Sequence, residues 1–420
     1  MKILSNSTRA SFSTYRGTHI NTNILFTLSH GLFASWFLQE STYGLKAKEA
    51  GCGLFLQRLI WIPPPVNRMQ MWGKCLELLG ICRQVAFIRF LQSFWNPRAD
   101  PSLSAKDLHF DGVPVRVYQP KAPSAGPRKG LMFFHGGAGM VGSIGKRLRW
   151  PSNLCFETSS QRDYRLAPEH LPPAQYKDCL AATIHLIQNA ASHGVDPSKI
   201  IVGGDSAGGN YATVVAQKLV ERSDLPKLWA QVLIYGKFQA IDFNLPSYQQ
   251  NSSMPPLFRE DVAYFIMKYI GRDTSLAGQL LKGAHVPDSM RLKYGKLVSL
   301  DNLPERFKVR GYKQVPLAPY EPEVYRQLRE LLEPDISCLF AEDSVIQKLP
   351  ETLIVSCEYD VLRDDAQLYK KHLEDNGVKV SWFHVENGFH GVLNLFDAGL
   401  FTLPAAVELM DRIVDFVKNL

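Results

Sequence analysis

Runs of apolar residues predict the secondary structure along most of the chain. The stretch KDLHFDGVPVRVYQP alternates apolar and polar positions with period two, as in a pair of half-buried strands. GLMFFHGG is continuously apolar before two glycines, as in a buried strand. Downstream, strand-like segments alternate with segments whose apolar positions recur every three or four residues. This order favours an α/β fold, with an open, mostly parallel sheet and helices on both of its faces.

The second half of the chain carries most of this alternation. The strand-like segments are KIIVGG, AQVLIYG, ETLIVSCEYD and VKVSWFHVEN. The helix-like segments are KDCLAATIHLIQNAA, AGGNYATVVAQKLVE, DDAQLYKKHLEDNG, which Gly377 closes, and PAAVELMDRIVDFVKNL. Ligands of such sheets bind beyond the carboxyl ends of the strands. Residues that directly follow a strand are therefore the first candidates for a functional site.

Two parts of the chain interrupt the alternation. Residues 51–104 read as basic helices broken by prolines, and residues 238–350 are rich in Pro, Gln and aromatic residues. We predict that both cover the ligand-binding edge of the sheet. The first would be a helical cap segment, and the second a cap insertion within a hydrolase domain of residues 105–420. The aromatic residues of these segments, which either line an apolar pocket or belong to the core, include Trp61, Trp72 and Phe258.

The N-terminal part differs from the rest in charge. Residues 1–100 carry 11 Lys and Arg against 4 Asp and Glu, whereas the remainder carries 36 of each kind. Because the body is neutral, we predict no nucleic-acid partner. Within a basic N-terminal segment of residues 1–50, residues 24–38 are mostly apolar but shorter than the about 20 residues that span a bilayer. They predict a membrane anchor or signal-like segment, or an amphipathic helix on the body or at the membrane interface.

Composition narrows the chemistry further. Hydrophobic residues make up 45% of the chain and charged residues 21%, which are ordinary values for a globular protein. The 7 cysteines form no C-x-x-C pair, so the spacing of a redox site or a structural zinc site is missing, and we expect no metal. The glycosylation tripeptides at Asn6 and Asn251 would be used only in a secretory compartment.

A serine between a predicted strand and a predicted helix carries the first candidate chemistry. Gly204 and Gly208 stand two places on either side of Ser206, in the pattern G-x-S-x-G. A strand that turns directly into a helix at a serine strains its backbone, lifts its hydroxyl above the sheet and leaves no room for larger neighbours. The alternative is a glycine-rich turn with an incidental serine. Ser206 is therefore the candidate nucleophile.

The motif HGG directly follows the apolar strand LMFF. From this position, backbone N–H groups that lack side chains can approach a carbonyl oxygen closely. The N–H of Ala207, at the start of the next predicted helix, points toward the same developing charge. We predict that the N–H groups of Gly136, Gly137 and Ala207 form an oxyanion hole, with His135 as part of the motif.

A serine hydroxyl is a weak nucleophile, so it needs a base, and the base needs an acid that fixes its tautomer. Asp360 ends one predicted strand and His390 follows the next, which gives the order Ser, Asp, His that is typical of α/β-hydrolases. The alternatives to the aspartate are Asp364 and Asp365, which the pattern places in a first helical turn. The alternative to the histidine is His384, which we predict on a solvated strand face.

The motifs HGGAGMVGS, DYRLAPEH, GDSAGGN, DVLRDD and GFHG resemble the hormone-sensitive-lipase-like, or lipase GDXG, branch of the α/β-hydrolases. Specifically, they resemble the arylacetamide deacetylase family, over residues 70–420. The resemblance implies an α/β-hydrolase fold with Ser206, Asp360 and His390 as catalytic residues and no cofactor. It also implies a small lipophilic ester or arylamide substrate, and an endoplasmic-reticulum membrane protein with an N-terminal anchor and a lumenal catalytic domain.

One segment departs from the family pattern. Only 19 residues, IGKRLRWPSNLCFETSSQR, separate Ser143 from Asp163, where the family has a helix and an apolar strand. Pro151 lies inside the segment, and FETSSQR has no strand pattern. We therefore predict that one central strand is missing or rearranged. This leaves two functions open: an active hydrolase, or a catalytically impaired relative that binds a lipophilic ligand or partner without turnover.

Residues 137–142 also satisfy the pattern G-x-G-x-x-G, which is typical of dinucleotide sites. No acidic residue ends a second strand about 20 positions later, and His135 has no role in such a site. Next to it, GSIGKR lacks the spacing and the hydroxyl residue of a phosphate loop. The sequence therefore predicts no nucleotide cofactor.

Overall fold

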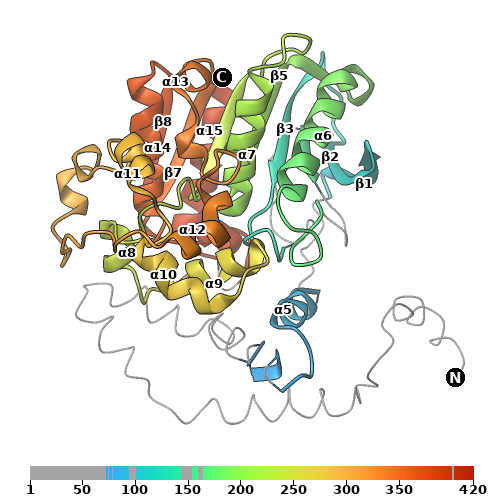
Figure 1. The fold of residues 1–420 in the computed structure, drawn as a ribbon. Coiled ribbons are helices and arrows are strands. Elements are labelled where there is room, and N and C mark those ends of the chain that lie inside the picture. The colour runs from blue at the N-terminus through green and yellow to red at the C-terminus, as the bar shows by residue number, and fades with distance from the viewer. Residues whose placement is uncertain are drawn as a thin grey trace, which may run out of the picture. The chain divides into compact units, whose positions relative to one another are not determined.

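The computed structural model of the protein contains a central β-sheet covered by helices (Figure 1). The model describes residues 72–93 except 74 and 78, 101–142, the backbone of 154–158, 164–399 and 402–420. The predicted segments 1–50 and 24–38, Asn6 and Trp61 lie outside the described residues. Within the described ranges, no helix combines the length and the apolar character needed to cross a membrane.

The described strands form one eight-stranded sheet in the order β1-β2-β4-β3-β5-β6-β7-β8. β2 runs antiparallel to both of its neighbours, whereas all adjacent pairs from β4 to β8 are parallel. The strands are β1 (Leu103–Phe110), β2 (Val113–Pro120), β3 (Arg128–Phe134), β4 (Leu154–Thr158), β5 (Val195–Asp205), β6 (Ala230–Ile234), β7 (Glu351–Tyr359) and β8 (Val380–Phe389).

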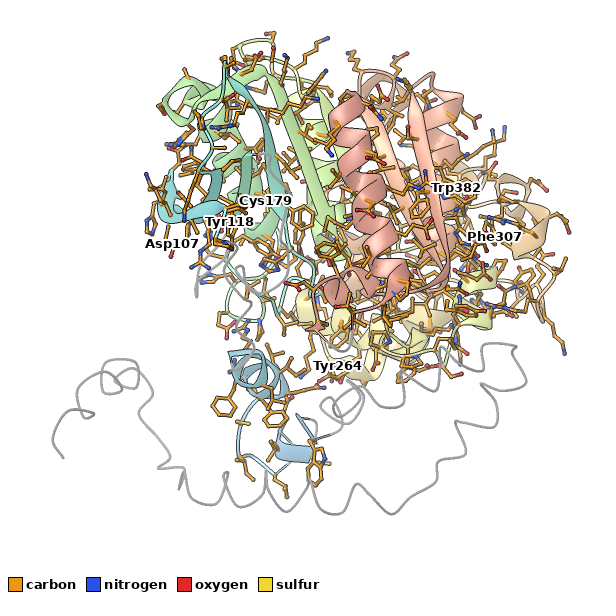
Figure 2. All side chains as sticks on the ribbon, turned by 180° about the vertical axis from the view of Figure 1, so that it is seen from behind. Asp107, Tyr118, Cys179, Tyr264, Phe307 and Trp382 are labelled. Atoms are coloured by element: carbon orange, nitrogen blue, oxygen red, sulfur yellow. The ribbon has the colours of Figure 1, made fainter. Side chains whose placement is uncertain are left out.

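Helices cover both faces of this sheet, as the alternating pattern predicts. Three of them lie over one face (Figure 1), and the last helix crosses the opposite face, which Figure 2 shows from behind. The three are α6 (Ala174–Gln188), α7 (Ala207–Leu219) and α14 (Arg363–Asp375), and the last is α15 (Pro404–Asn419). The predicted α/β-hydrolase architecture is confirmed.

The apolar patterns of β6 and β2 match the burial of their residues. β6, with the sequence AQVLI, is buried at every position because it lies inside the sheet with helices on both sides. β2 alternates buried and half-buried residues over most of its length, as its period-two sequence predicts. Side chains of the sheet and of α6, α7 and α14 join in one core, with Met132, Val202 and Ile354 fully buried.

β4 corrects the prediction of a missing central strand. Leu154–Thr158 pairs in parallel with β3 and antiparallel with β2, so the position between these strands is filled. Residues 135–153 connect β3 to β4, which exceeds the roughly 10 to 12 residues that a parallel crossover needs. The strand begins two residues before FETSSQR, the stretch that lacks a strand pattern, and includes its first three residues. The structure therefore does not support the prediction that the sheet lacks a central strand.

The long connection between β6 and β7 builds a separate layer. Figure 1 shows α8, α9, α10 and α12 gathered at one end of the sheet. This is the carboxyl end of β7, because the Asn251 amide, just beyond α8, contacts the carbonyl of Asp360. The helices are α8 (Pro246–Gln250), α9 (Arg259–Tyr269), α10 (Ala277–Lys282), α11 (Asp288–Tyr294), α12 (Pro322–Leu328) and α13 (Asp343–Ile346). The cap limits 51–104 and 238–350 stay predictions.

Shorter elements complete the described chain. α5 (Gln84–Ser93) is tied to the body by Arg89, whose side chain donates to the carbonyls of Met140 at 2.7 Å and Ala167 at 2.8 Å. The 3-10 helices are η2 (Ala190–His193), η3 (Thr274–Leu276), η4 (Leu300–Asn302), η5 (Glu305–Phe307), η6 (Arg329–Leu332), η7 (Cys338–Phe340) and η8 (Val392–Leu395).

Candidate active site

Ser206 stands in the turn between β5 and α7. Its backbone has φ 54° and ψ −120°, a strained conformation for a residue with a side chain. A Cβ at Gly204 would lie 2.3 Å from the backbone of Gly208, and one at Gly208 would lie 1.9 Å from the carbonyl oxygen of Phe134. The two glycines are therefore required by close backbone approach, which is the reason given for the G-x-S-x-G spacing.

The side chains of Ser206, His390 and Asp360, which were predicted as a triad, are connected by two hydrogen bonds. The Ser206 hydroxyl lies 2.9 Å from His390 Nε2, and His390 Nδ1 lies 2.9 Å from Asp360 Oδ2. A carboxylate only accepts, so Nδ1 carries the proton and Nε2 presents its lone pair to the serine. Asp360 follows β7 and His390 follows β8, so all three side chains come from the carboxyl ends of parallel strands.

The carboxylate at the end of this line is held in place. Asp360 is 1% exposed, and its second oxygen accepts the N–H of Leu362 at 2.9 Å. The ring of Tyr235 packs edge-on against the imidazole of His390, with centroids 5.1 Å apart. Sequence reasoning missed Tyr235, although its position directly after β6 places it at the same sheet edge.

The HGG loop differs from the prediction at one residue. The N–H of Gly136 donates to Asp205 Oδ1 at 2.7 Å, so it is engaged within the protein and does not serve as a free oxyanion donor. A Cβ at Gly136 would also collide with Asp205 and with Ser206 Cβ. Asp205, which the sequence analysis did not single out, thus anchors the loop beside the serine.

Three other N–H groups remain as candidate donors. The structure records no hydrogen bond from the N–H of Gly137 or Ala138 to any other described residue. Ala207 is the first residue of α7, where a helical N–H has no partner within its own helix. Ala138 has φ 56°, so this alanine adopts a conformation that usually belongs to glycine.

His135 packs within the HGG loop and helps to fix its conformation. Its Nδ1 lies 2.7 Å from the carbonyl oxygen of Gly136, and its ring stacks on Tyr164 with centroids 4.6 Å apart. Tyr164 also donates its hydroxyl to the carbonyl of His135 at 3.0 Å. A Cβ at Gly142 would lie 2.4 Å from His135 Nδ1, so this last glycine of the G-x-G-x-x-G pattern makes room for the histidine ring.

The alternative acids serve another purpose. Asp364 and Asp365 lie in the first turn of α14, as predicted, and are completely buried. Asp364 pairs with Arg363 at 2.9 Å, and Asp365 accepts the N–H of Phe238 at 2.9 Å. Burial raises the pKa of Asp365 to about 6, although its hydrogen bonds oppose this shift. Asp364 also accepts the N–H of Ser247 at 2.6 Å, so both carboxylates connect the insertion to α14.

The side chain of the alternative base is nearly covered, which corrects the prediction of a solvated face. The His384 side chain is 5% exposed, and its ring nitrogens lie 2.9 Å from Ser356 Oγ and 3.1 Å from Glu358 Oε2. This is a second line of hydroxyl, imidazole and carboxylate, but Ser356 is 0% exposed. Period-two alternation could not reveal that η5, an element distant in sequence, covers this strand: the ring of Phe307 packs on His384.

The same neighbourhood holds the one group of potential metal ligands found among the described residues. Ligand atoms of Glu358, His384 and Glu386 lie within 4.8 Å of one another. Burial would raise the pKa of Glu358, but His384, Arg363 and Arg310 hold it below its usual value. Arg306 pairs with Glu386 at 3.0 Å. The carboxylates are thus already paired with cations, which disfavours a divalent ion at this place.

Comparisons with known proteins identify the family of this chain. A family model described as the alpha/beta hydrolase fold matches residues 131–290 and 320–394. The sequence is 43% identical to arylacetamide deacetylase-like 3 of Mus musculus and 42% identical to arylacetamide deacetylase-like 4 of Homo sapiens, over 83% of this chain and 86% of each relative. The chain belongs to the arylacetamide deacetylase family. The resemblance inferred from the sequence motifs is thereby confirmed.

Further members of the arylacetamide deacetylase family and related structures extend this result. Arylacetamide deacetylase of Mus musculus is 37% identical over 76% of this chain and 82% of its own length. Carboxyl esterase 2 of Tuber melanosporum superposes with a TM-score of 0.57 and 20% identity, covering 77% of this chain and 89% of that one. This last likeness concerns the fold.

Proposed function

We propose that this protein is a serine hydrolase that cleaves carboxylic esters or arylamides of small lipophilic substrates. Ser206 would be the nucleophile, His390 the general base and Asp360 the residue that orients the imidazole. The observation that carries the proposal is the line of two 2.9 Å hydrogen bonds through Ser206, His390 and Asp360. The names of the relatives, which include arylacetamide deacetylase, support the substrate class.

The chemistry follows from these positions. Ser206 attacks the substrate carbonyl while His390 Nε2 accepts the hydroxyl proton, and Asp360 stabilises the imidazolium that forms. The N–H groups of Gly137, Ala138 and Ala207 are the proposed donors to the oxyanion of the tetrahedral intermediate. His390 then protonates the leaving alcohol or amine, and a water molecule, activated in the same way, releases the acid.

The alternative of a binding protein without turnover rested on the missing strand. Since β4 fills that position, no observation now favours the alternative over hydrolysis. The location at the endoplasmic-reticulum membrane, with a lumenal catalytic domain, also belongs to this proposal. It is supported by the family resemblance and by the apolar residues 24–38.

Hydrolysis of an aryl acetate and of the matching aryl acetamide tests the proposal. We expect the wild type to release the aryl product from at least one of them, and Ser206→Ala to be slower by at least about 1,000-fold. Ser356→Ala is the matched control, because Ser356 also lies 2.9 Å from a histidine but is completely buried. Equal loss in both variants, or no hydrolysis by the folded wild type, would refute the proposed function.

A further inference from the structure

Asn251 is a residue of the insertion that contacts the backbone of the candidate acid, Asp360. It follows α8 directly, is 0% exposed and points its amide at the end of β7. Its Nδ2 donates to two carbonyl oxygens, that of Glu358 at 3.0 Å and that of Asp360 at 2.9 Å. One side chain therefore holds the backbone on both sides of Tyr359.

Regular strand pairing does not hold the end of β7 in place. β7 pairs with β8 in register as far as Cys357, and the register shifts before Tyr359. A register shift disrupts the ladder, so a carbonyl at that point needs a donor from elsewhere. Asn251 supplies the donor at Glu358 and a second one at Asp360, the residue whose carboxylate faces His390.

Neighbouring contacts fix the orientation of the Asn251 amide. Arg310 donates to Asn251 Oδ1 at 2.7 Å, so the oxygen faces a cation and the NH2 group faces the two carbonyls. The same guanidinium lies 3.4 Å from Glu358 Oε1. The buried Asn251 amide is thus part of a polar network that reaches the surface at Arg310.

Residues of α8 also contact the turn that follows β7. The Ser247 hydroxyl donates to the carbonyl of Val361 at 2.7 Å, and the Ser247 N–H donates to Asp364 Oδ2 at 2.6 Å. The buried guanidinium of Arg363 donates to Gln250 Oε1 of α8 at 2.9 Å and lies over the ring of Phe307, which Figure 2 labels. Contacts from the insertion therefore surround the backbone that carries Asp360.

We propose that Asn251 is a positioning residue for Asp360. By fixing the carbonyls on both sides of Tyr359, it sets the direction in which the Asp360 carboxylate meets His390, and it couples the insertion to the triad. This inference rests on the proposed function. It also gives the tripeptide Asn251-Ser252-Ser253 a structural role, because the buried, doubly donating amide is not available to carry a glycan in the folded chain.

The test compares Asn251→Asp with Asn244→Asp in the full chain. Asn244 is a matched control: it is a buried asparagine of the same insertion, its Oδ1 accepts from Arg259 at 2.7 Å, and its Nδ2 donates to the carbonyl of Leu281. We expect Asn251→Asp to lower kcat for an aryl acetate by about 100-fold with little change in KM, because misplacement of a catalytic group has that effect. Asn244→Asp is expected to keep the wild-type kcat.

A second readout does not depend on turnover. In protein with 15N-labelled histidine, the Nδ1 proton of His390 that is shared with Asp360 is expected as a low-field resonance, kept in Asn244→Asp and lost in Asn251→Asp. Asn251→Ala, which removes the donor without adding charge, is measured in parallel in case the aspartate variant does not fold.

The outcomes separate the two proposals. Wild-type kcat and an unchanged resonance in the Asn251 variants, or equal losses in the Asn244 variant, would overturn the positioning role. If the wild type hydrolyses nothing, but its low-field resonance disappears only in the Asn251 variants, the proposed function fails and the positioning role stands.

Discussion

At the scale of single residues, backbone strain gathers around the candidate site. Non-glycine residues with positive φ in the described chain are Asp111, Ala138, Ser206 and Tyr235. Ala138 follows the HGG motif, Ser206 is the candidate nucleophile, and Tyr235 packs against His390. Such conformations persist only where the surroundings enforce them, and they tend to cluster at functional sites. The strain thus supports, independently of the hydrogen bonds, the place assigned to the chemistry.

Ala138→Gly is expected to stabilise the protein. The left-handed conformation at φ 56° costs an alanine about 1 kcal/mol, and glycine adopts it freely. The free energy of unfolding in urea should therefore rise by about 1 kcal/mol. Ala181→Gly, in the middle of α6, is the control and should lower the same quantity by about 1 kcal/mol. A loss of stability in Ala138→Gly equal to that of the control would contradict the assigned conformation.

Residue types could be predicted from the sequence, whereas their partners could not. The order and spacing of Ser206, Asp360 and His390 identified three side chains that the structure brings together. The same reasoning predicted the N–H of Gly136 as an oxyanion donor. Nothing in the motif shows that the loop after β3 places this N–H against the Asp205 carboxylate. Such partners depend on hydrogen bonds between residues that are distant in sequence, and a sequence motif does not specify them.

At the scale of elements, β4 shows the limit of local pattern. Its five residues have an ordinary length for a strand, but the sequence around them has no long apolar run. What makes them a strand is the space between β2 and β3, where both neighbours offer backbone groups to pair. The other strands were predicted correctly because each carries its own apolar run or alternation.

Hydrogen–deuterium exchange tests β4 directly. Amides of Leu154–Thr158 pair on both sides, so we expect them to exchange about as slowly as those of β3. The loop 121–127, which lies outside the strands and helices, provides the fast reference within the same experiment. Exchange of the 154–158 peptide at the rate of that loop would show that the strand is not formed.

At the scale of the whole molecule, the charge balance separates a neutral body from a basic N-terminal part. Stability of the body nevertheless depends on pH through buried groups. His285 is completely buried in the insertion, its Nε2 lies 2.7 Å from the carbonyl oxygen of Ala240, and its Nδ1 has no partner in the described part of the chain. Burial lowers the pKa of His285 to about 4, with Arg291 and Lys237 adding to the shift.

The lowered pKa of this buried histidine makes the folded state less stable at acidic pH. The unfolded chain binds the proton near pH 6.5 and the folded chain only near 4, so the contribution of His285 is complete above pH 6.5. It falls by about 1.4 kcal/mol per pH unit between these values. His285→Gln should remove this part of the pH dependence, as measured by urea unfolding from pH 7 to pH 4. Because buried Asp365 titrates in the same window, the difference between variant and wild type is the informative quantity. A constant difference would contradict the assignment.

We propose that Ser206 is an activated nucleophile in this folded α/β-hydrolase. The most direct test exposes purified protein to a fluorophosphonate probe beside a Ser206→Ala variant and locates the adduct by mass spectrometry. We expect one adduct, on Ser206 in the wild type, and none in the variant. A wild-type protein that unfolds cooperatively and carries no adduct on Ser206 would contradict it.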